Sequence, residues 1–333
     1  MISSILMLFA GLGAFLAGMK LISYYSEAIA GGKIEELLSK LSDNKIASIG
    51  IGVGSSAILQ SSSATTVILI GLVNAGIVSL FQATCIIMGA NIGTTFTAII
   101  MSLNSLPISE VCAFLTFVGI MMVMASRKST TRTIGWIITS IGLIFIGLDI
   151  IKASANALNE SDTLTKVFTS INSPMMLLLI GAIFTAIIQS SSATTGMLIP
   201  LATLGIMPVV STFYIIMGSN VGSCMTAIIS AMGGSLNAKR TAVIHFIFNA
   251  IGVIVFLPIV IIFNAKIENF KAYVSPSALI AYFHVIFNLF TTIILIPFIN
   301  RIVNLAVKFV PNKKEKKLAN ENKIIDTIPC LSI

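Results

Sequence analysis

The stretch Gln60-Ser-Ser-Ser-Ala-Thr-Thr66 occurs a second time in this chain, as Gln189-Ser-Ser-Ser-Ala-Thr-Thr195. The copies lie 129 residues apart, and the same offset aligns Gly52 with Gly181. One offset holds without a gap from residue 13 to residue 100. Apolar composition raises chance identity, but it does not repeat a seven-residue polar motif. We therefore predict an internal duplication, in which each copy forms one structural unit.

A second repeated segment follows each motif at the same offset. Met88-Gly-Ala-Asn-Ile-Gly93 is matched by Met217-Gly-Ser-Asn-Val-Gly222. Paired glycines and an asparagine inside an apolar segment suggest a second break in the helix. The alternative is close helix packing through small residues.

The composition places this chain in a membrane. Of its 333 residues, 56% are hydrophobic and 10% are charged, and the mean hydropathy is +1.02. A soluble domain carries about 25% charged residues, so this chain has too few to cover a surface that faces water. We expect this chain to lie in a lipid bilayer and not to bind nucleic acid.

Seven segments are long and apolar enough to span a bilayer, which takes about 20 residues. Two further apolar regions, 46–76 and 174–206, are each interrupted by a copy of the motif, and we expect each to form a hairpin that leaves the membrane on the side it entered. The expected spans are 3–27, 81–103, 108–126, 131–155, 208–232, 238–264 and 278–307.

The repeat also predicts the topology. Three spans and a hairpin per unit leave the second unit starting from the opposite side, so the units are inverted, a common plan for secondary transporters. The predicted fold is an all-α polytopic membrane protein with two inverted repeats, each with a re-entrant helical hairpin, plus an extra C-terminal span. The predicted boundaries are 1–128 for repeat 1, 129–264 for repeat 2, 265–307 for the extra helix and 308–333 for a basic cytoplasmic tail.

The distribution of positive charge tests this topology. With the lysine-rich tail in the cytoplasm, the cytoplasmic segments hold 15 lysines and arginines and the outer segments hold 4. Positive residues favour the cytoplasmic side. We therefore expect a plasma-membrane protein with a cytoplasmic C-terminus and an outer N-terminus. Lys20 falls inside the first span, where we favour a position near the helix end that lets its amine reach the headgroups.

The repeated motif carries the polar chemistry. Unsatisfied polar groups in hydrocarbon cost several kcal/mol each, and a broken backbone is tolerated there only where it is buried in protein or lines a watery cavity. Hydroxyl, amide and freed carbonyl oxygens suit a sodium ion, and free N–H groups at a helix start suit an oxyanion. Helix packing through small polar residues is the alternative. The expected binding residues are Gln60, Ser61, Ser62, Ser63, Thr65 and Thr66, with Gln189, Ser190, Ser191, Ser192, Thr194 and Thr195, and we expect the second half of each hairpin to begin near Ala64 and Ala193.

The glycine-containing segments supply further candidates. Thr95 is matched by Cys224, so a coupling-ion site could exist in one half only. The remaining candidate binding residues are Asn91, Thr94 and Thr95 in the first half and Asn220 and Ser223 in the second.

Both histidines precede an asparagine by four residues, as His245 with Asn249 and His284 with Asn288. Residues at this spacing share a helix face. We favour hydrogen bonding between helices for these pairs over a proton relay. No carboxylate pair, nucleophile with a base, or phosphate-cradling loop followed by lysine is present, so an enzyme is not expected.

The duplicated motif, the Gly-x-Asn-x-Gly segments and the His-x-x-Phe-Asn segments resemble the type II sodium–phosphate cotransporter family over residues 5–300. The resemblance implies secondary transport of inorganic phosphate coupled to sodium, with 60–66 and 189–195 lining a shared substrate site. Many bacterial relatives carry a soluble regulatory domain, which we expect to be absent here or supplied by a separate regulatory protein. The alternatives are phosphate efflux or transport of another oxyanion by the same site, and a non-transporting membrane scaffold or receptor.

Overall fold

A computed structural model describes residues 2–40, 44–103, 109–159, 165–166, 170–171 and 173–312. Regular secondary structure in these ranges is helical throughout, which confirms the all-α prediction. The helices are α1 (Ile2–Ser39), α2 (Lys45–Leu59), α3 (Ser62–Asn74), α4 (Leu80–Ser102), α5 (Ser109–Ala125), α6 (Ser129–Asn159), α8 (Pro174–Ile188), α9 (Ser191–Thr203), α10 (Val209–Ala231), α11 (Leu236–Ile262), α12 (Asn264–Asn269), α13 (Pro276–Leu295) and α14 (Ile299–Phe309).

The sequence repeat reappears in the helix boundaries. Helices α8, α9 and α10 begin and end 129 residues after α2, α3 and α4, respectively. Each half therefore contains two short helices that meet at the polar motif, followed by one helix of 23 residues. Identical boundaries follow because the residues that break and cap these helices are the repeated ones.

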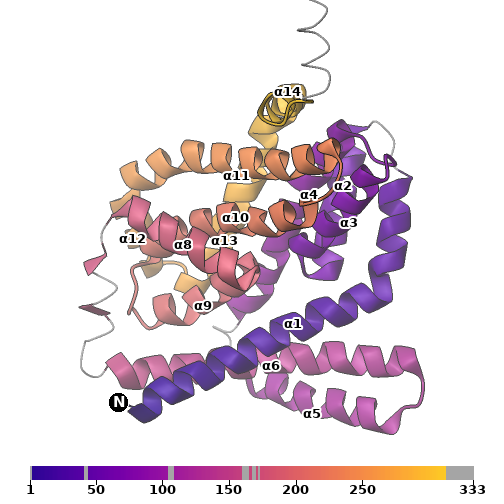
Figure 1. Cartoon of the computed structure of the whole chain (residues 1–333). Coiled ribbons are helices and arrows are strands. Elements are labelled where there is room, and N and C mark those ends of the chain that lie inside the picture. Colours follow the sequence, from indigo (N-terminus) through magenta and orange to yellow (C-terminus); the bar gives the residue numbers. More distant parts are fainter. Residues whose placement is uncertain are drawn as a thin grey trace, which may run out of the picture.

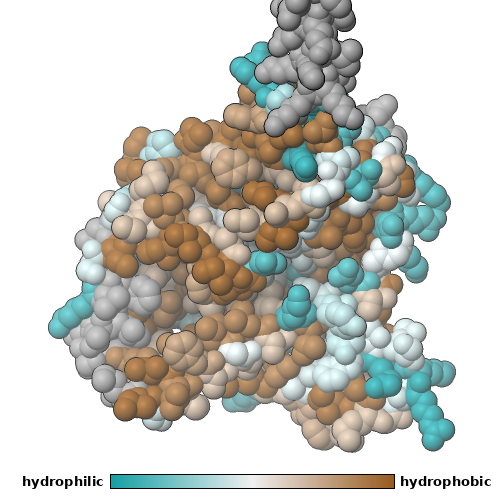
Figure 2. All heavy atoms as spheres, in the orientation of Figure 1, coloured by the Kyte–Doolittle hydropathy of each residue, from teal (hydrophilic) through white to brown (hydrophobic). Residues whose placement is uncertain are grey.

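Six helices among the described residues are long and apolar enough to cross a membrane. They are α1, α4, α6, α10, α11 and the combined segment Pro276–Phe309. The seventh expected span, 108–126, forms α5 with 17 residues, at the lower end of spanning lengths. Figure 2 shows apolar residues over most of one face, with hydrophilic residues gathered mainly at the right of the view. The chain is a multi-pass membrane protein.

The helices form two groups (Figure 1). In the first, which we call the outer layer, α1 packs along α6 and α6 packs along α5. The second, which we call the central body, contains α2–α4 and α8–α14, with α2 packed on α4 and α8 packed on α10. Phe15 of α1 is fully buried where the two groups meet, because its ring lies against Gly196 of α9.

Glycines bring α2 and α4 into backbone contact. A Cβ atom on Gly89 would collide with the carbonyl oxygen of Ile49, and one on Gly93 would collide with that of Val53. The same contacts recur between α8 and α10, where Gly218 faces Leu178 and Gly222 faces Ala182. In both pairs the contact positions advance together, so the paired helices run parallel.

The second break predicted at 89–95 and 218–224 is wrong. Both α4 and α10 run unbroken through these segments. The glycines instead permit close helix packing, which was the alternative interpretation.

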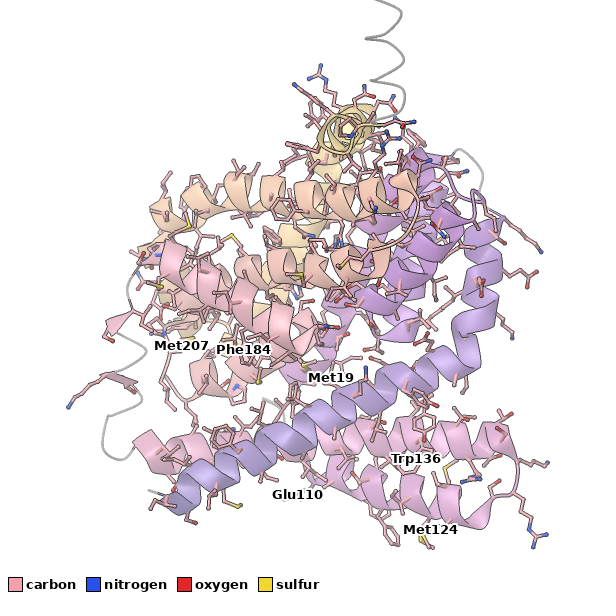
Figure 3. The ribbon with its side chains drawn as sticks, in the orientation of Figure 1. Met19, Glu110, Met124, Trp136, Phe184 and Met207 are labelled. Atoms are coloured by element: carbon pink, nitrogen blue, oxygen red, sulfur yellow. The ribbon has the colours of Figure 1, made fainter. Side chains whose placement is uncertain are left out.

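The repeat-related helices α1 and α6 run in opposite directions. Gly11 lies against Ile150, Gly18 against Ile144, and the ring of Tyr25 stacks on Trp136 with 5.5 Å between centroids. Trp136 accordingly lies between the two helices in Figure 3. Residues early in α1 thus meet residues late in α6.

Two expected segments differ from the structure. The first span was expected to end at residue 27, but α1 continues to Ser39. The expected single span 278–307 is two helices, α13 and α14, joined by a 3-10 turn at Ile296–Phe298 that contains Pro297. Proline cannot donate the backbone hydrogen bond that a continuous helix needs, and α14 turns away from α13 (Figure 1).

The glycine contacts yield a stability prediction. In α2, a Cβ on Gly52 would collide with the carbonyl oxygen of Ile86, whereas Gly54 has no neighbour within 4 Å. Gly52→Ala should destabilise the protein by about 1–3 kcal/mol through overpacking. Gly54→Ala is the matched control and should be neutral or slightly stabilising, because alanine favours helix. Thermal unfolding in detergent measures both, and equal midpoints would contradict the packing account.

Candidate functional site

Each motif begins with a glutamine in an unusual backbone conformation. Gln60 ends α2 with φ 52° and Gln189 ends α8 with φ 60°, and both lie in the left-handed region. They are the only residues other than glycine with positive φ in the described ranges. Glycine is the usual residue at such a helix end, and left-handed backbone at other residues clusters at functional sites. The recurrence of glutamine at both ends indicates that its side chain is needed there.

The Gln60 side chain is held on both of its polar atoms. Its Nε2 donates to the carbonyl oxygen of Ala57 at 2.7 Å, and its Oε1 accepts from the Thr97 hydroxyl at 2.9 Å. The α2 terminus is thereby fixed against α4.

A serine caps the helix that follows each glutamine. Ser61 Oγ accepts from the Ala64 amide at 3.1 Å, and Ser190 Oγ accepts from the Ala193 amide at 3.2 Å. The N-caps are thus Ser61 and Ser190, and α3 and α9 begin at Ser62 and Ser191, slightly earlier than the expected starts near Ala64 and Ala193. The first amides of each helix have no partner within the helix, so α3 and α9 each present free N–H groups at the break.

The two motifs meet in one pocket of about 590 Å³. Its lining includes Gln60, Ser61, Ser62 and Ser63 from the first motif and Gln189, Ser190, Ser191 and Ser192 from the second. Ser63 Oγ donates to the carbonyl oxygen of Gln189 at 3.4 Å, which joins the breaks directly. Two helix ends and two helix starts, from segments 129 residues apart, therefore surround one space.

The motif threonines do not line this pocket. Thr65 and Thr66 donate to the carbonyl oxygens of Ser61 and Ser62, and Thr194 lies 2.7 Å from Thr185. Thr195 Oγ1 is buried without a partner among the described residues. Three of these side chains thus secure the starts of α3 and α9.

The candidates on the long helices also lie outside the pocket lining. Asn91, Thr94 and Thr95 donate to backbone carbonyls of their own helix, and Thr94 also lies 3.4 Å from the hydroxyl of Ser56. Ser223 donates to the carbonyl of Asn220. These side chains are buried beside the motif helices and are not gathered with the motif serines.

Hydrogen bonding between helices is observed at one histidine. His284 Nε2 lies 3.4 Å from Asn220 Oδ1, and Asn220 Nδ2 donates to Asn288 Oδ1 at 3.4 Å. Asn288 in turn donates to the carbonyl of His284. This chain of bonds joins α10 to α13. His245 is also buried, and neither of its ring nitrogens has a partner among the described residues.

Sequence reasoning missed the contribution of α1. Lys20, Ser23, Tyr24 and Glu27 line the pocket together with Met19, which extends from α1 toward the central body in Figure 3. Ser23 Oγ donates to the Gln60 carbonyl oxygen at 3.4 Å. Ser23, Tyr24 and Glu27 follow Lys20 by three, four and seven residues, so the four polar side chains share one helix face. This spacing is visible in the sequence and could have predicted a polar face on α1. The sequence predicts Lys20 near a helix end, but Lys20 lies near the middle of α1.

This arrangement can bind ions of both signs. A helix N-terminus carries about half a positive charge and offers free N–H groups to an anion. The carbonyl and amide oxygens at the ends of α2 and α8 suit a hard cation. Serine hydroxyls can serve either ion because they both donate and accept.

Comparisons with known proteins place most of this chain in one family. The model of the family described as Na+/Pi-cotransporter matches residues 14–153 and 156–288. "Uncharacterized protein YqeW" of Bacillus subtilis is 32% identical over 300 residues, which cover 90% of this chain and 96% of that protein. "Putative inorganic phosphate export protein YjbB" of Escherichia coli is 26% identical over 289 residues, so this chain spans about half of YjbB, with 86% of this chain covered and 52% of YjbB.

A shorter similarity reaches a human protein. "Sodium-dependent phosphate transport protein 2B" is 38% identical over 86 residues, which cover 25% of this chain and 12% of that protein. No solved structure matches this chain. The family match covers most of the sequence and includes both motifs, and it agrees with the expectation of a transporter and not an enzyme. This chain belongs to the Na+/Pi-cotransporter family.

Proposed function

We propose that this protein is a secondary transporter that moves inorganic phosphate coupled to sodium by alternating access. The observation that carries the proposal is the single pocket in which the two repeated motifs meet. Family membership and the names of the relatives support phosphate as the substrate. A scaffold would have no need for two paired helix breaks around a shared space.

Phosphate binds between the starts of α3 and α9. These helices direct free amides and the serine hydroxyls of both motifs toward the pocket. A tetrahedral oxyanion has several acceptor oxygens, so donors from two directions can be used at once. Two helix starts together supply about one positive charge, which partly neutralises the anion without a metal.

Sodium binds next to phosphate, at oxygen atoms of the same breaks. The carbonyl oxygens of Gln60 and Gln189 lie at the pocket and accept bonds from Ser23 and Ser63. We keep Asn91, Thr94, Thr95, Asn220, Ser223 and the motif threonines as candidates for a supporting role, because they are buried on the helices that hold the breaks. A cation next to the anion would lower the cost of holding either ion in a membrane.

The two units are proposed to be inverted repeats with re-entrant hairpins. Helices α1 and α6 are related by the repeat, and their contacts run in opposite directions. Helix α2 runs parallel to α4, as expected when the hairpin α2–α3 returns the chain to the side from which it entered. The same relation holds for α8 and α10.

In the proposed orientation, the lysine-rich tail lies on the cytoplasmic side of the membrane and the N-terminus lies on the opposite side. The end of α1, the link from α5 to α6 and the start of α11 lie at the right of Figure 1, and α12 lies at the left. Lys40 directly follows α1, Arg127 and Lys128 lie in the link from α5 to α6, and Arg240 lies near the start of α11. Arg240 Nε donates to the Val310 carbonyl at 3.0 Å, which brings the end of α14 to the start of α11. This charge distribution supports a cytoplasmic right-hand end.

We propose that the outer layer moves relative to the central body during transport, and that the pocket lies at the boundary between them. The hairpin helices α2 and α8 touch α4 and α10 through backbone atoms at glycines, which leaves little room for sliding. The pocket instead lies between α1 and the two breaks, and one hydrogen bond, from Ser23 to the Gln60 carbonyl at 3.4 Å, joins α1 to the first break. In this conformation α1 lines the pocket and α6 does not, and an inverted partner state would exchange those roles.

Phosphate efflux is the second candidate, because YjbB is named for phosphate export. The same pocket can serve either direction, since the direction of a secondary transporter follows the gradients and not the site.

Reconstituted protein tests the coupled transport. Proteoliposomes with an inward sodium gradient should accumulate radiolabelled phosphate, and excess sulfate should not abolish the uptake. Potassium in place of sodium is the control. Equal uptake under a proton gradient would show that protons can replace sodium as the coupling ion. Release of phosphate from preloaded vesicles, without any uptake, would favour efflux. Absence of phosphate flux under every gradient, with folded protein, would refute the proposed substrate.

Substitutions at the glutamines test the pocket. Gln60→Ala and Gln189→Ala should each reduce sodium-dependent uptake about tenfold or more, because each removes the amide at a helix break and leaves alanine in the left-handed backbone, a cost of about 1–3 kcal/mol. Gln60→Gly and Gln189→Gly retain the left-handed backbone and separate strain from side-chain chemistry. The glycine variants should also lose uptake. Near-normal uptake in them would show that the amide is dispensable and that the motif serves packing.

Crosslinking tests the moving boundary. In a variant without native cysteines, Ser23→Cys and Ala64→Cys place thiols on α1 and α3 at opposite walls of the pocket. A short bifunctional thiol reagent should abolish transport by this pair. Tyr25→Cys with Trp136→Cys is the matched control, because both residues lie within the outer layer. Transport should survive that crosslink, and full transport by the crosslinked first pair would rule out the proposed motion.

A further inference from the structure

We infer that Lys20 of α1 is a phosphate-binding residue, so that the outer layer supplies the positively charged group of the pocket. This inference rests on the proposed function of the same pocket and adds a residue outside both motifs. It connects one helix of the outer layer to an anion that the central body alone would otherwise hold.

Lys20 is an exceptional residue in its helix. It is the only charged side chain among the first 26 residues of the chain, and α1 is a candidate membrane span. An ionisable residue inside a span is costly and usually faces a water-filled cavity or the bundle interior. Lys20 satisfies this expectation because it lines the pocket between the two groups of helices.

The pocket is otherwise poor in charge. Lys20 and Glu27 are the only ionisable residues of its lining besides Tyr24, and the remaining lining residues are neutral. Lys20 and Glu27 stand seven residues apart, about 10 Å along the helix axis. The structure shows no ion pair for Lys20 with any described residue. Its ammonium group is therefore available to an anion in the pocket.

The geometry of α1 brings this charge to the breaks. Ser23, one turn beyond Lys20, donates to the Gln60 carbonyl oxygen at 3.4 Å. Met19, the preceding residue, is buried and lines the same pocket. Lys20 thus lies on a helix segment that contacts the first motif in this conformation, and its flexible four-carbon chain extends from there toward the pocket.

Lys20 supplies the one full positive charge of the pocket lining, and Glu27 supplies one full negative charge about two helical turns away. The starts of α3 and α9 and the ends of α2 and α8 carry about half a charge each, of opposite sign. Because these four partial charges nearly cancel, Lys20 is the lining group that can neutralise an anion bound at the starts of α3 and α9. The repeat equivalent of Lys20 is Asp149, which does not line the pocket, so this positive charge belongs to one half of the molecule only.

Equilibrium binding of radiolabelled phosphate to the purified protein, at saturating sodium, tests the inference. Lys20→Gln should raise the dissociation constant about tenfold or more, the usual effect of losing a charged hydrogen-bond partner. Lys20→Arg should restore binding to within a few fold, because it keeps the charge. Lys33→Gln is the matched control, since Lys33 lies on the same helix outside the pocket, and it should bind as the unaltered protein does.

The outcomes separate the two proposals. No phosphate binding by the unaltered protein would refute the proposed function itself. Binding by the unaltered protein with an equal dissociation constant for Lys20→Gln would overturn the role of Lys20 alone. Equal weakening in Lys20→Gln and Lys20→Arg, with unchanged thermal stability, would also overturn it, because the effect would then reflect the shape of the lysine side chain and not its charge.

Discussion

Backbone polar groups cannot remain unpaired in the hydrocarbon of a membrane, and the structure is organised around two places where this chain breaks its helices nonetheless. At Gln60 and Gln189 the backbone turns into the left-handed region, and a new helix starts two residues later. Each break leaves free carbonyls on one helix and free amides on the next. These groups need partners, and the two breaks meet so that they share one polar space. The backbone groups that would destabilise an isolated hairpin thereby line the pocket that we propose as the binding site.

The rest of the fold keeps the breaks in place. Glycines at 52, 89 and 93 let α2 lie against the backbone of α4, and those at 181, 218 and 222 do the same for α8 and α10. Helices in a membrane have little hydrophobic drive to associate, so such close packing supplies much of their attraction. A hairpin held this rigidly presents its serines at fixed positions, which a small ion requires for selective binding.

The outer layer has a different role. Helices α1 and α6 pack along each other, yet of these two only α1 contributes side chains to the pocket lining in this conformation. The repeat is therefore nearly symmetric in its backbone and asymmetric in its charges, with Lys20 on α1 where α6 carries Asp149. In the proposed mechanism, the two similar halves would offer the substrate different surroundings in the two states.

The sequence by itself determined the membrane class, the duplication, the helix breaks and the family, because each depends on composition or on a repeated local pattern. The left-handed glutamines and their serine caps are local too, so the breaks appear within two or three residues of their expected places. The second break expected near Asn91 and Asn220 failed because glycine permits both a bend and a close contact, and only the neighbouring helix decides between them. Tertiary structure alone brought Lys20 to the motifs and kept Asn91 and Asn220 away from the pocket lining. The physical reason is that helix faces are set by crossing and packing between segments far apart in the chain, which no local pattern encodes.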